Sequence, residues 1–416
     1  MLSSARVLSS AKSTVSSHRF QVLKSNQPLG SPDFAAALPQ RKHRSVRVGA
    51  SLSRNTDPVR WTQSTLAGLL AAGLLSAGSL RPLSASAAVS MAAAVDPKSV
   101  PTTKLNSGFD IPVIGWGTFG ANDDLGTKAT HTALAAGYRF IDTGVTYGNE
   151  GAIGKALKEE LSSGKIKRED LFICSKLWSD QHSESGAYNA VKGSLKALNV
   201  DYIDLYLIHW PVTDKTGDKF TPPTEETWKG LERAVDEGLV KSIGLSNYSP
   251  EKIEPWIKDA RIKPAVNQVE VHAHFRNARV REFAKANNIH VTAYSPLSSP
   301  ANVKDMGMDM PNLMEDKTVL ELAKKYNKSP TQVLLRWGIQ NGNSVIPKSA
   351  SAEHQQANIN IFDFELSAED QQKLSSFSYQ AKCITGEGFG YSEKGPWHTY
   401  EELWNEPEPA QQPRPS

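Results

Sequence analysis

The sequence predicts an α/β protein built as a (β/α)8 TIM barrel that begins with a β-hairpin. From about residue 101 onward, short runs rich in β-branched residues alternate with longer amphipathic segments, the pattern of βα units around a parallel sheet. Eight strand candidates can be counted, and eight parallel strands in about 320 residues favour a closed barrel over a doubly wound sheet. The chain also lacks the glycine fingerprint that opens a Rossmann unit.

A basic, Ser-rich leader precedes the barrel. Residues 1–95 hold eleven Lys and Arg but only two acids, Asp33 and Asp57, so they carry +9 and the rest of the chain −6. Such an N-terminus is typical of an organelle transit peptide and does not indicate a nucleic-acid partner. We expect residues 1–95 to be disordered or removed, 96–406 to form the barrel, and the Pro-rich 407–416 to be a disordered tail.

The leader contains an uncharged run, Leu66–Leu80, that is too short for a comfortable membrane span. One interpretation is a signal h-region followed by a peptidase site at Ala85-Ser86-Ala87, which would direct the protein to the thylakoid lumen. The other is low-complexity transit sequence. Met91 could also serve as an internal start and give a cytosolic form. Chloroplast is the predicted compartment, ahead of mitochondrion or cytosol, and no stable membrane association is expected.

The elements of the barrel follow in order. Lys104–Pro112 predicts a hairpin with its turn at Asn106-Ser107-Gly108, placed to close the barrel bottom. The eight strands are expected at Val113–Thr118, Arg139–Gly144, Leu171–Leu177, Ile203–Trp210, Val240–Asn247, Ala265–His272, His290–Leu297 and Ser344–Ser349. Between them, Glu150–Leu161 and Val319–Tyr326 have the apolar spacing of helices.

Two later helices have clear start signals. Ser329 precedes Pro330 and stands three residues before Gln332, and Ser367 stands three residues before Asp370. Both patterns fit an N-cap with an acceptor at the third helical position.

The chain contains only two cysteines, Cys174 and Cys383. Two cysteines give no disulfide framework and no Cys-based metal site, so we expect no metal.

Four polar residues end or follow apolar runs at the C-terminal ends of predicted strands, where a barrel places its active site. Asp142 ends FID, and Tyr147 stands five residues later in DTGVTYGNE. Lys176 ends FICSK, and His209 ends LYLIH. Taken singly, each has an ordinary structural explanation as a cap, a packing residue or a buried core residue.

Together, these residues make a coherent acid. Lys176 would be costly to bury alone in an apolar barrel mouth, and Asp142 is a suitable ion partner. The cation beside Tyr147 should favour the phenolate and lower the pKa of the phenol from about 10 toward the working pH. His209 can donate a hydrogen bond to a substrate carbonyl and polarise it.

The phrases DTGVTYGNE, SKLW, LYLIHWP, GLSNY, NQVEVH, AYSPL and IPKS, in this order over residues 101–405, resemble the aldo-keto reductase superfamily. Plant and fungal aldose and xylose reductases look nearest. The resemblance implies NADPH-dependent reduction of aldehydes and ketones to alcohols by hydride transfer from the nicotinamide C4. It makes Tyr147 the proton donor, lets Lys176 and Asp142 tune it, and gives His209 the role of orienting the carbonyl.

The resemblance also assigns the cofactor residues. Ser246, Asn247 and Gln268 match contacts to the nicotinamide carboxamide, Tyr294 matches the stacking aromatic, and Ser295, Leu297 and Ser299 match pyrophosphate contacts. Lys348 and Ser349 match the pair that reaches the 2′-phosphate, Asn358 matches an adenine contact, and Gly117, Thr118 and His354 complete the set. Many members carry Arg at the position of His354 and a carboxylate at that of Ala357. Imidazole replaces guanidinium poorly, so NADH use stays open.

Aromatic residues at strand ends predict an apolar substrate pocket. Phe119, Trp178 and Trp210 should line it together with His209. In the family the C-terminal segment, here Cys383–Trp404, covers the site as a specificity loop. Aldehydes, including sugar aldehydes and lipid-derived carbonyls, are the expected substrates, and a monomer is the expected assembly.

Other function classes remain alternatives. Some superfamily members are cofactor-binding regulatory subunits of membrane channels with little turnover, and an intact set of four residues does not exclude this role. A barrel hydrolase is disfavoured because the sequence lacks paired carboxylates and a His/Asp metal cluster. Within the chloroplast, the stroma is preferred over the lumen because NADPH is made on the stromal side.

Overall fold

Eight parallel strands form one sheet, in which neighbouring strands follow the order of the chain. The structure, a computed structural model, describes residues 94–213, 223–299, 310–393 and 395–408. The strands are β3 (Trp116–Gly117), β4 (Phe140–Asp142), β5 (Phe172–Leu177), β6 (Ile203–Ile208), β7 (Val240–Ser246), β8 (Val266–Glu270), β9 (His290–Tyr294) and β10 (Ser344–Val345). Each of the eight predicted strands is present, and each is shorter than its predicted range.

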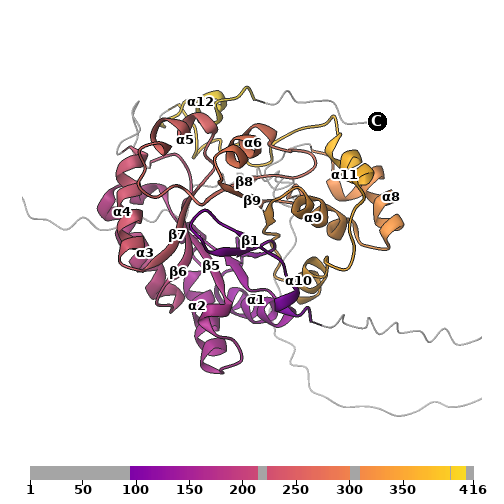
Figure 1. Cartoon of the computed structure of the whole chain (residues 1–416), viewed down its shortest axis with the longest axis horizontal. Helices are drawn as coiled ribbons and strands as arrows, with labels where there is room; N and C mark the ends of the chain where they lie inside the picture. Colours follow the sequence, from indigo (N-terminus) through magenta and orange to yellow (C-terminus); the bar gives the residue numbers. More distant parts are fainter. Residues whose placement is uncertain (1–93, 214–222, 300–309, 394, 409–416) are drawn as a thin grey trace, which may run out of the picture. The chain divides into compact units, whose positions relative to one another are not determined.

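Backbone hydrogen bonds between the segments of the first and last strands close the sheet. Gly115 N donates to Val345 O over 2.9 Å, and Val345 N donates to Val113 O over 3.0 Å. Farther along, Gly117 N donates to Pro347 O over 3.2 Å. Helices surround the strands in Figure 1. The (β/α)8 barrel predicted from the sequence is therefore confirmed.

Helices lie between successive strands from β3 to β10, and in the described residues three more follow the last strand. They are α1 (Asp123–Ala136), α2 (Glu150–Ser162), α3 (Glu184–Leu198), α4 (Thr224–Asp236), α5 (Pro250–Ile257), α6 (Ala278–Ala286), α8 (Lys317–Tyr326), α9 (Pro330–Gln340), α10 (Ala352–Ile359), α11 (Ala368–Ser375) and α12 (Tyr400–Trp404). Short 3₁₀ turns occur at Pro97–Ser99, Val145–Tyr147, Arg168–Asp170, Ser179–Gln181 and Leu313–Glu315. Both predicted caps are present, because Ser329 Oγ accepts from Gln332 N at 3.2 Å and Ser367 Oγ accepts from Asp370 N at 3.2 Å.

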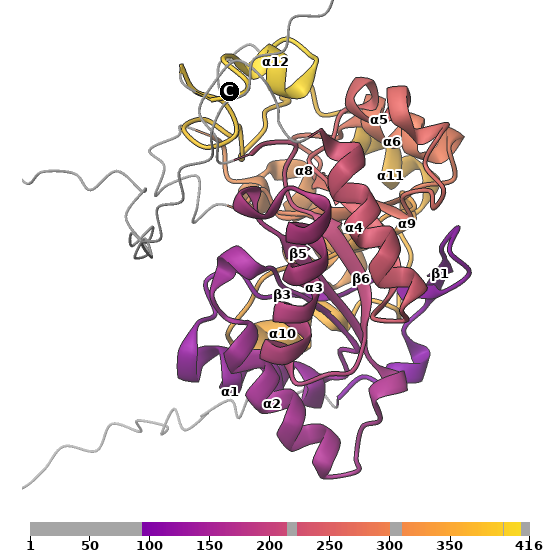
Figure 2. The ribbon, with the colours of Figure 1, turned by 90° about the vertical axis from the view of Figure 1, so that its left-hand side faces the viewer.

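The predicted hairpin is formed by β1 (Thr102–Lys104) and β2 (Asp110–Pro112), which pair antiparallel. Its turn needs Gly108, whose φ of +89° favours glycine. Leu105 and Ile111 pack against barrel residues such as Phe140. Ser107 Oγ lies 2.7 Å from the Oγ of Ser242, near the start of β7. The hairpin, at the right-hand edge of Figure 2, therefore covers the end of the barrel where the strands begin.

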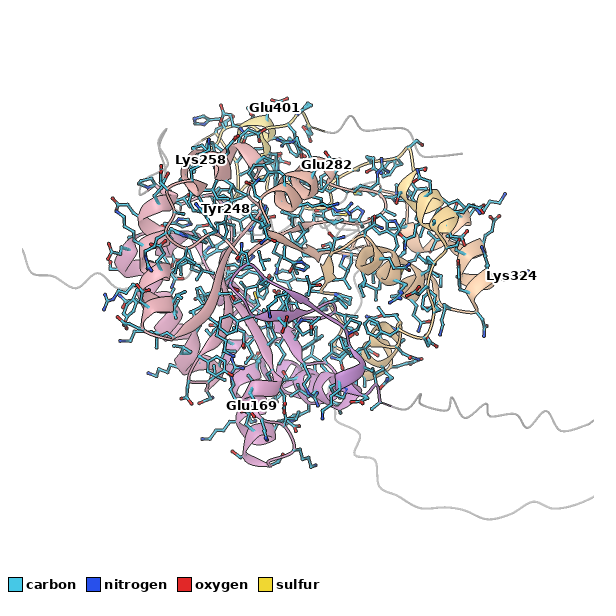
Figure 3. All side chains as sticks on the ribbon, viewed as in Figure 1. Glu169, Tyr248, Lys258, Glu282, Lys324 and Glu401 are labelled. Carbon is cyan, nitrogen blue, oxygen red and sulfur yellow. The ribbon has the colours of Figure 1, made fainter. Side chains whose placement is uncertain are left out.

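Buried apolar side chains form three clusters in the described residues, and the smallest joins Trp210 to the C-terminal helix α12. Of the other two, the larger core lies between the strands and the helices and includes Tyr248, which is 1% exposed. The smaller core lies inside the barrel and contains Phe172, Leu205 and Val266. In Figure 3 charged side chains such as Glu169 and Lys324 point outward from the rim, whereas Tyr248 lies within the molecule.

The leader and tail predictions fall almost wholly outside the described residues. Residues 1–93, which include the run Leu66–Leu80, and residues 409–416 are not described, and the chain divides into the units Met1–Ser84 and Ala85–Ser416. Val95, assigned above to the leader, donates its backbone N–H to Ala136 O over 3.1 Å. Among the described helices, none is long and apolar enough to cross a membrane.

Candidate active site

The alternation of side chains along each strand brings three of the four predicted residues together. Successive strand residues point to opposite faces, so every second residue shares the barrel interior. Phe140 and Asp142 form such a pair on β4, and Phe172, Cys174 and Lys176 form a column on β5. On β6, Leu205 and Leu207 lead in the same way to His209. The apolar residues fill the interior, and the polar residue that ends each column reaches the barrel mouth.

Lys176 and Asp142 form a buried ion pair. Lys176 Nζ lies 2.6 Å from Asp142 Oδ1 and 2.6 Å from the backbone oxygen of Thr143, and the lysine side chain is fully buried. Burial alone would lower the pKa of Lys176, but the charge of Asp142, together with Tyr147, Cys174 and the hydrogen bond to Asp142, outweighs it and holds that pKa above its ordinary value. Lys176 is therefore a fixed cation at the base of the mouth, as the sequence predicted.

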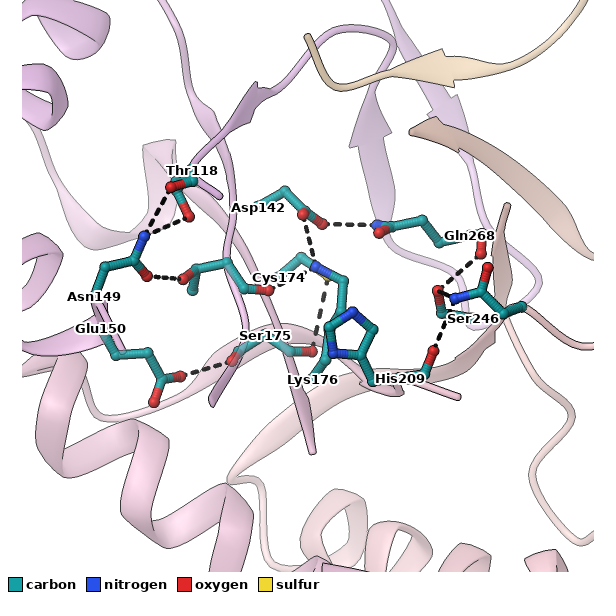
Figure 4. A network of polar contacts seen from close by, with 12 residues as sticks. Thr118, Asp142, Asn149, Glu150, Cys174, Ser175, Lys176, His209, Ser246 and Gln268 are labelled. Atoms are coloured by element: carbon teal, nitrogen blue, oxygen red, sulfur yellow. Dashed lines mark hydrogen bonds and ion pairs between the residues drawn. The ribbon is translucent and has the colours of Figure 1, made fainter. Parts of the chain in front are cut away.

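Gln268 supports this pair from the opposite wall of the barrel. Its Nε2 donates to the second carboxylate oxygen of Asp142, Oδ2, over 2.7 Å (Figure 4). Its backbone oxygen accepts hydrogen bonds from Ser246 Oγ at 2.9 Å and from Asn247 N at 3.0 Å. Gln268 was predicted only as a cofactor contact. The structure shows that it also links Asp142 to Ser246 and Asn247, which were predicted to hold the nicotinamide.

Tyr147 ends the 3₁₀ turn Val145–Tyr147, between β4 and α2. Asn149, just after this turn, forms hydrogen bonds with Thr143, just before it, and with Thr118. Asn149 was not among the predicted site residues. Asn149 Nδ2 donates to the backbone oxygen of Thr118 over 2.8 Å, and Asn149 Oδ1 accepts from Thr143 Oγ1 at 2.7 Å. The phrase DTGVTYGNE contains both Thr143 and Asn149, but their contacts with each other are visible only in three dimensions.

The ring of Tyr147 lies beside both Lys176 and His209. Lys176 Nζ is 5.0 Å from the ring centroid, and the ring of His209 is 5.5 Å away in an edge-to-face arrangement. The four predicted residues Asp142, Tyr147, Lys176 and His209 are therefore grouped at one end of the barrel.

The predicted direction of the Tyr147 pKa is wrong for the structure as it stands. Burial raises the pKa of Tyr147 above its ordinary value, and Asp142 adds to this effect. Lys176 acts in the opposite direction, as expected, but it does not outweigh the burial. The sequence showed the charge beside the phenol, but not how far the surrounding side chains would exclude water.

His209 is buried, at 8% exposure. Burial, followed by the nearby charge of Lys176, holds the pKa of His209 well below its ordinary value. The imidazole is therefore neutral at physiological pH and keeps one N–H to donate. Its Nδ1 has no hydrogen-bond partner among the described residues. His209 therefore stands at the barrel mouth as a neutral ring with a hydrogen-bonding nitrogen that the described residues do not use.

The residues predicted to hold the nicotinamide form one hydrogen-bonded group. Asn247 Nδ2 donates to the backbone oxygen of His209 over 3.0 Å, and Asn247 Oδ1 accepts from Tyr294 Oη at 2.8 Å. Ser295 and Ser299, after β9, have positive φ angles of 47° and 37°, and their hydroxyls are 2.7 Å apart. These residues share the end of the barrel with Asp142, although their roles as cofactor contacts stay predictions.

The residues predicted for the adenosine end lie near the start of α10. Lys348 is exposed, and no partner of its ammonium group is found in the described parts of the chain. His354 is exposed on the first turn of α10, and Asn358 is buried four residues later. Ser349 already donates its hydroxyl to Ser351 O over 3.2 Å. Lys348 and the start of α10 thus offer positive charge and N–H groups to a phosphate, whereas the Ser349 hydroxyl has a local partner.

The remaining predicted positions also lie near the mouth. Gly117 and Thr118 are buried, and Thr118 N donates to Asp142 O over 3.1 Å. Leu297 is half-buried in the loop after β9 and packs against the larger core.

Aromatic rings surround His209 and Tyr147. Phe119, which is 56% exposed, lies 5.2 Å from the ring of Tyr147, and Trp178 lies 5.2 Å from the ring of His209. Phe389, from the C-terminal segment, lies 4.8 Å from Trp210 and 6.3 Å from Trp178. The C-terminal segment therefore reaches the aromatic residues that the sequence predicted for substrate contact.

One further polar cluster was not foreseen. Glu270, His272 and Cys383 are buried, and their potential ligand atoms all lie within 4.8 Å of one another. His272 Nε2 lies 2.9 Å from Glu270 Oε1 and 3.5 Å from Cys383 Sγ, so the three side chains already contact one another. The sequence phrase NQVEVH contains two of the three residues, but Cys383 is more than one hundred residues away in the chain. The expectation of no metal stays a prediction.

Comparison with known proteins extends these findings. The model of the aldo/keto reductase family matches residues 113–378. Aldo-keto reductase family 4 member C11 of Arabidopsis thaliana is 37% identical over 309 residues, which cover 73% of this chain and 96% of the relative. The NADH-dependent D-xylose reductase of Candida parapsilosis is 37% identical over 297 residues, which cover 66% of this chain and 91% of the relative.

Solved structures agree with the sequence relatives. The aldose reductase from Schistosoma japonicum superposes with a TM-score of 0.62 at 39% identity, over 69% of this chain and 97% of the other. An aldo-keto reductase of Bombyx mori, solved in complex with NADP, gives a TM-score of 0.65 at 34% identity, over 71% of this chain and 98% of the other. By sequence, fold and the match over residues 113–378, the chain belongs to the aldo/keto reductase family of oxidoreductases.

Proposed function

We propose that this protein reduces aldehydes and ketones to alcohols with NADPH, and that Tyr147 is the proton donor. The observation that carries the proposal is the buried Lys176–Asp142 pair beside the ring of Tyr147, with a neutral His209 also next to that ring. A fixed cation next to a phenol stabilises negative charge that develops on the phenol oxygen as its proton leaves. This arrangement suits proton donation to a carbonyl oxygen.

Each residue of the group has a distinct part in the proposal. His209 donates a hydrogen bond to the carbonyl oxygen, which orients the substrate and polarises the C=O bond. Tyr147 transfers its phenol proton to that oxygen. Lys176 stabilises the resulting phenolate, and Asp142 keeps Lys176 charged and in place.

The barrel mouth also fits a nicotinamide cofactor. Ser246 contributes a buried hydroxyl, and Asn247 and Gln268 contribute two buried amides. Tyr294 offers a ring, and the exposed Lys348 beside the start of α10 suits a phosphate. When bound, the nicotinamide supplies the hydride for the carbonyl carbon. We assign NADPH as the preferred form because of Lys348. NADH is the second candidate cofactor, because His354 stands where many members have Arg. One relative also carries the name NADH-dependent D-xylose reductase.

The aromatic rings define the substrate class. Phe119, Trp178 and Trp210 provide apolar surface around His209, so we assign them to substrate contact. Aldehydes with an apolar body, including lipid-derived carbonyls, suit this surface, and sugar aldehydes remain within the class.

We also propose that the protein acts as a monomer in the chloroplast stroma. A fluorescent reporter fused to residues 1–90 tests the compartment. Fluorescence in the thylakoid lumen, the mitochondrion or the cytosol would contradict a stromal location.

Steady-state oxidation of NADPH by the purified full chain tests the function. Aliphatic, aromatic and sugar aldehydes serve as substrates, and NADH replaces NADPH in a parallel series. We expect aldehyde-dependent oxidation, with a higher kcat/KM for NADPH than for NADH. Binding of NADPH without turnover of any aldehyde would contradict the proposal and favour a cofactor-binding regulatory subunit.

A further inference from the structure

One buried carboxylate at the end of β8 contacts two consecutive residues of the C-terminal segment. Glu270 is 1% exposed. Its Oε1 accepts from the backbone N of Cys383 at 2.5 Å, and its Oε2 accepts from the backbone N of Ile384 at 2.9 Å. Both oxygens of the carboxylate are therefore used on two consecutive amides of the C-terminal segment.

The carboxylate has further support. His272 Nε2 lies 2.9 Å from Glu270 Oε1. Burial alone would raise the pKa of Glu270, but the hydrogen bond with His272, the charge of Lys382 and the Cys383 amide hold it below its ordinary value. Glu270 is therefore ionised, and a buried charge is kept only where such partners stay in place.

Cys383 connects the same cluster to the loop after β9. Its Sγ donates to the backbone oxygen of Ser298 over 3.2 Å. Ser298 has a φ of +62°, and its neighbour Ser299 also has a positive φ. This backbone conformation is unfavourable for serine and needs support from surrounding contacts. The thiol supplies one such contact in the loop that contains the predicted pyrophosphate residues Ser295 and Ser299.

Beyond Ile384 the segment leads to the aromatic residues over the active site. Phe389 lies 4.8 Å from Trp210 and 6.3 Å from Trp178. The far side of the segment is held separately, because Trp397 Nε1 donates to Pro211 O over 2.6 Å. Glu270 thus fixes the near side of the stretch that carries Phe389.

We propose that Glu270 is a positioning residue for substrate recognition, which holds Phe389 over the active site by docking Cys383 and Ile384. Cys383 in turn ties this segment to the cofactor loop through Ser298. The inference rests on the proposed function for the identity of the substrate, but the docking itself does not depend on turnover. Its consequence is selective: long aldehydes that reach Phe389 depend on Glu270, whereas small aldehydes held at His209 do not.

The variant Glu270→Gln tests the docking in the full chain. The carboxylate of Glu270 has two acceptor oxygens, one for each backbone N–H, whereas the amide of Gln has only one. The NH₂ group of Gln would therefore face one of the two backbone N–H donors. Loss of this charge-assisted contact should speed hydrogen exchange at the amides of Cys383 and Ile384 by about tenfold or more. Glu232→Gln is the matched control, because Glu232 Oε1 accepts from Ile262 N at 2.9 Å on α4, away from the barrel mouth. It can keep that bond with its one amide oxygen, so it should leave exchange at Cys383 and Ile384 unchanged.

Ligand binding provides the second readout. Dissociation constants of propanal and of a long aromatic aldehyde are measured by tryptophan fluorescence, and KM values are measured alongside. Glu270→Gln should weaken the long aldehyde about tenfold and change propanal less than about twofold. Glu232→Gln should change neither. Phe389→Ala should give the same selective loss, and the double variant with Glu270→Gln should lose little more, because both changes remove one interaction.

Two results would overturn the proposal: unchanged exchange at Cys383 and Ile384, or equal weakening of both aldehydes in Glu270→Gln. If this variant does not fold, Glu270→Asp replaces it, because Asp keeps the charge but has a shorter side chain. Hydrogen exchange and aldehyde binding of Glu270→Asp then test the proposal in the same way. Absence of turnover in the unmodified protein would count against the proposed reductase function. In that case exchange and direct aldehyde binding still decide the role of Glu270.

Discussion

Gln268 Nε2 donates a hydrogen bond of 2.7 Å to Asp142 Oδ2, across the barrel from β8 to β4. Since the other carboxylate oxygen binds Lys176, this contact satisfies Asp142 on both sides. It also joins the ion pair to the hydroxyl of Ser246 through the Gln268 backbone. The residues proposed for proton donation and those proposed for cofactor binding therefore share one polar network.

Gln268→Leu should reduce kcat about tenfold, because it leaves Asp142 Oδ2 buried without its donor and frees the Lys176–Asp142 pair to shift. Gln340→Leu is the control, since Gln340 also makes two hydrogen bonds, both to the backbone of Leu366 on the outer side of the barrel. It should lower the unfolding free energy and leave kcat unchanged. Steady-state kinetics of both variants measure the difference; equal kcat values would argue against the network.

Lys176→Met should strongly destabilise the fold as well as reduce activity. It leaves the buried carboxylate of Asp142 without its cation, at a cost of about 3–5 kcal/mol in unfolding free energy. The double variant with Asp142→Asn should recover most of that stability, since no buried charge remains, but should not recover kcat. Urea unfolding and NADPH oxidation measure the two quantities, and recovery of activity with stability would contradict a chemical role for Lys176.

The pH profile should follow Tyr147 and not His209. The pKa of His209 lies well below its ordinary value. The imidazole should therefore stay neutral from about pH 6 upward, although an ordinary His is partly protonated at that pH. The pKa of Tyr147 is raised, so the phenol keeps its proton into the alkaline range. We expect kcat/KM for aldehyde reduction to be flat from about pH 6 to 9 and to fall only above that range. A fall centred near neutral pH that disappears in His209→Gln would show that His209 titrates.

His354→Arg should increase the preference for NADPH. A guanidinium on α10 can form two charge-assisted hydrogen bonds with a 2′-phosphate, which should tighten NADPH about tenfold and leave NADH unchanged. Dissociation constants for both cofactors, measured by fluorescence at low and high salt, test this. The gain should shrink at high salt, because the site is exposed. Equal tightening of NADH would place His354 away from the phosphate.

Much of the barrel and of the site could be predicted from the sequence because both depend on local patterns. Short runs rich in β-branched residues located the strands, and polar residues that end these apolar runs located Asp142, Lys176 and His209. The contacts of Gln268 with Asp142 and of Glu270 with Cys383 span more than one hundred residues, and no local pattern records such pairings.

The pKa of Tyr147 could not be predicted for a different reason. Its direction depends on the balance between exclusion of water and the charge of Lys176. The sequence shows that a charge is near, but the exclusion of water depends on how Phe119, His209 and their neighbours pack around the ring.

Proton donation by Tyr147 is tested most directly by the variant Tyr147→Phe. The change removes one oxygen and keeps the ring beside Phe119 and His209, so NADPH affinity should stay unchanged. Aldehyde-dependent NADPH oxidation by the full chain is the measurement. We expect kcat to fall about 10²–10⁴-fold. A kcat within about threefold of the unmodified protein, with NADPH still bound, would show that another group supplies the proton.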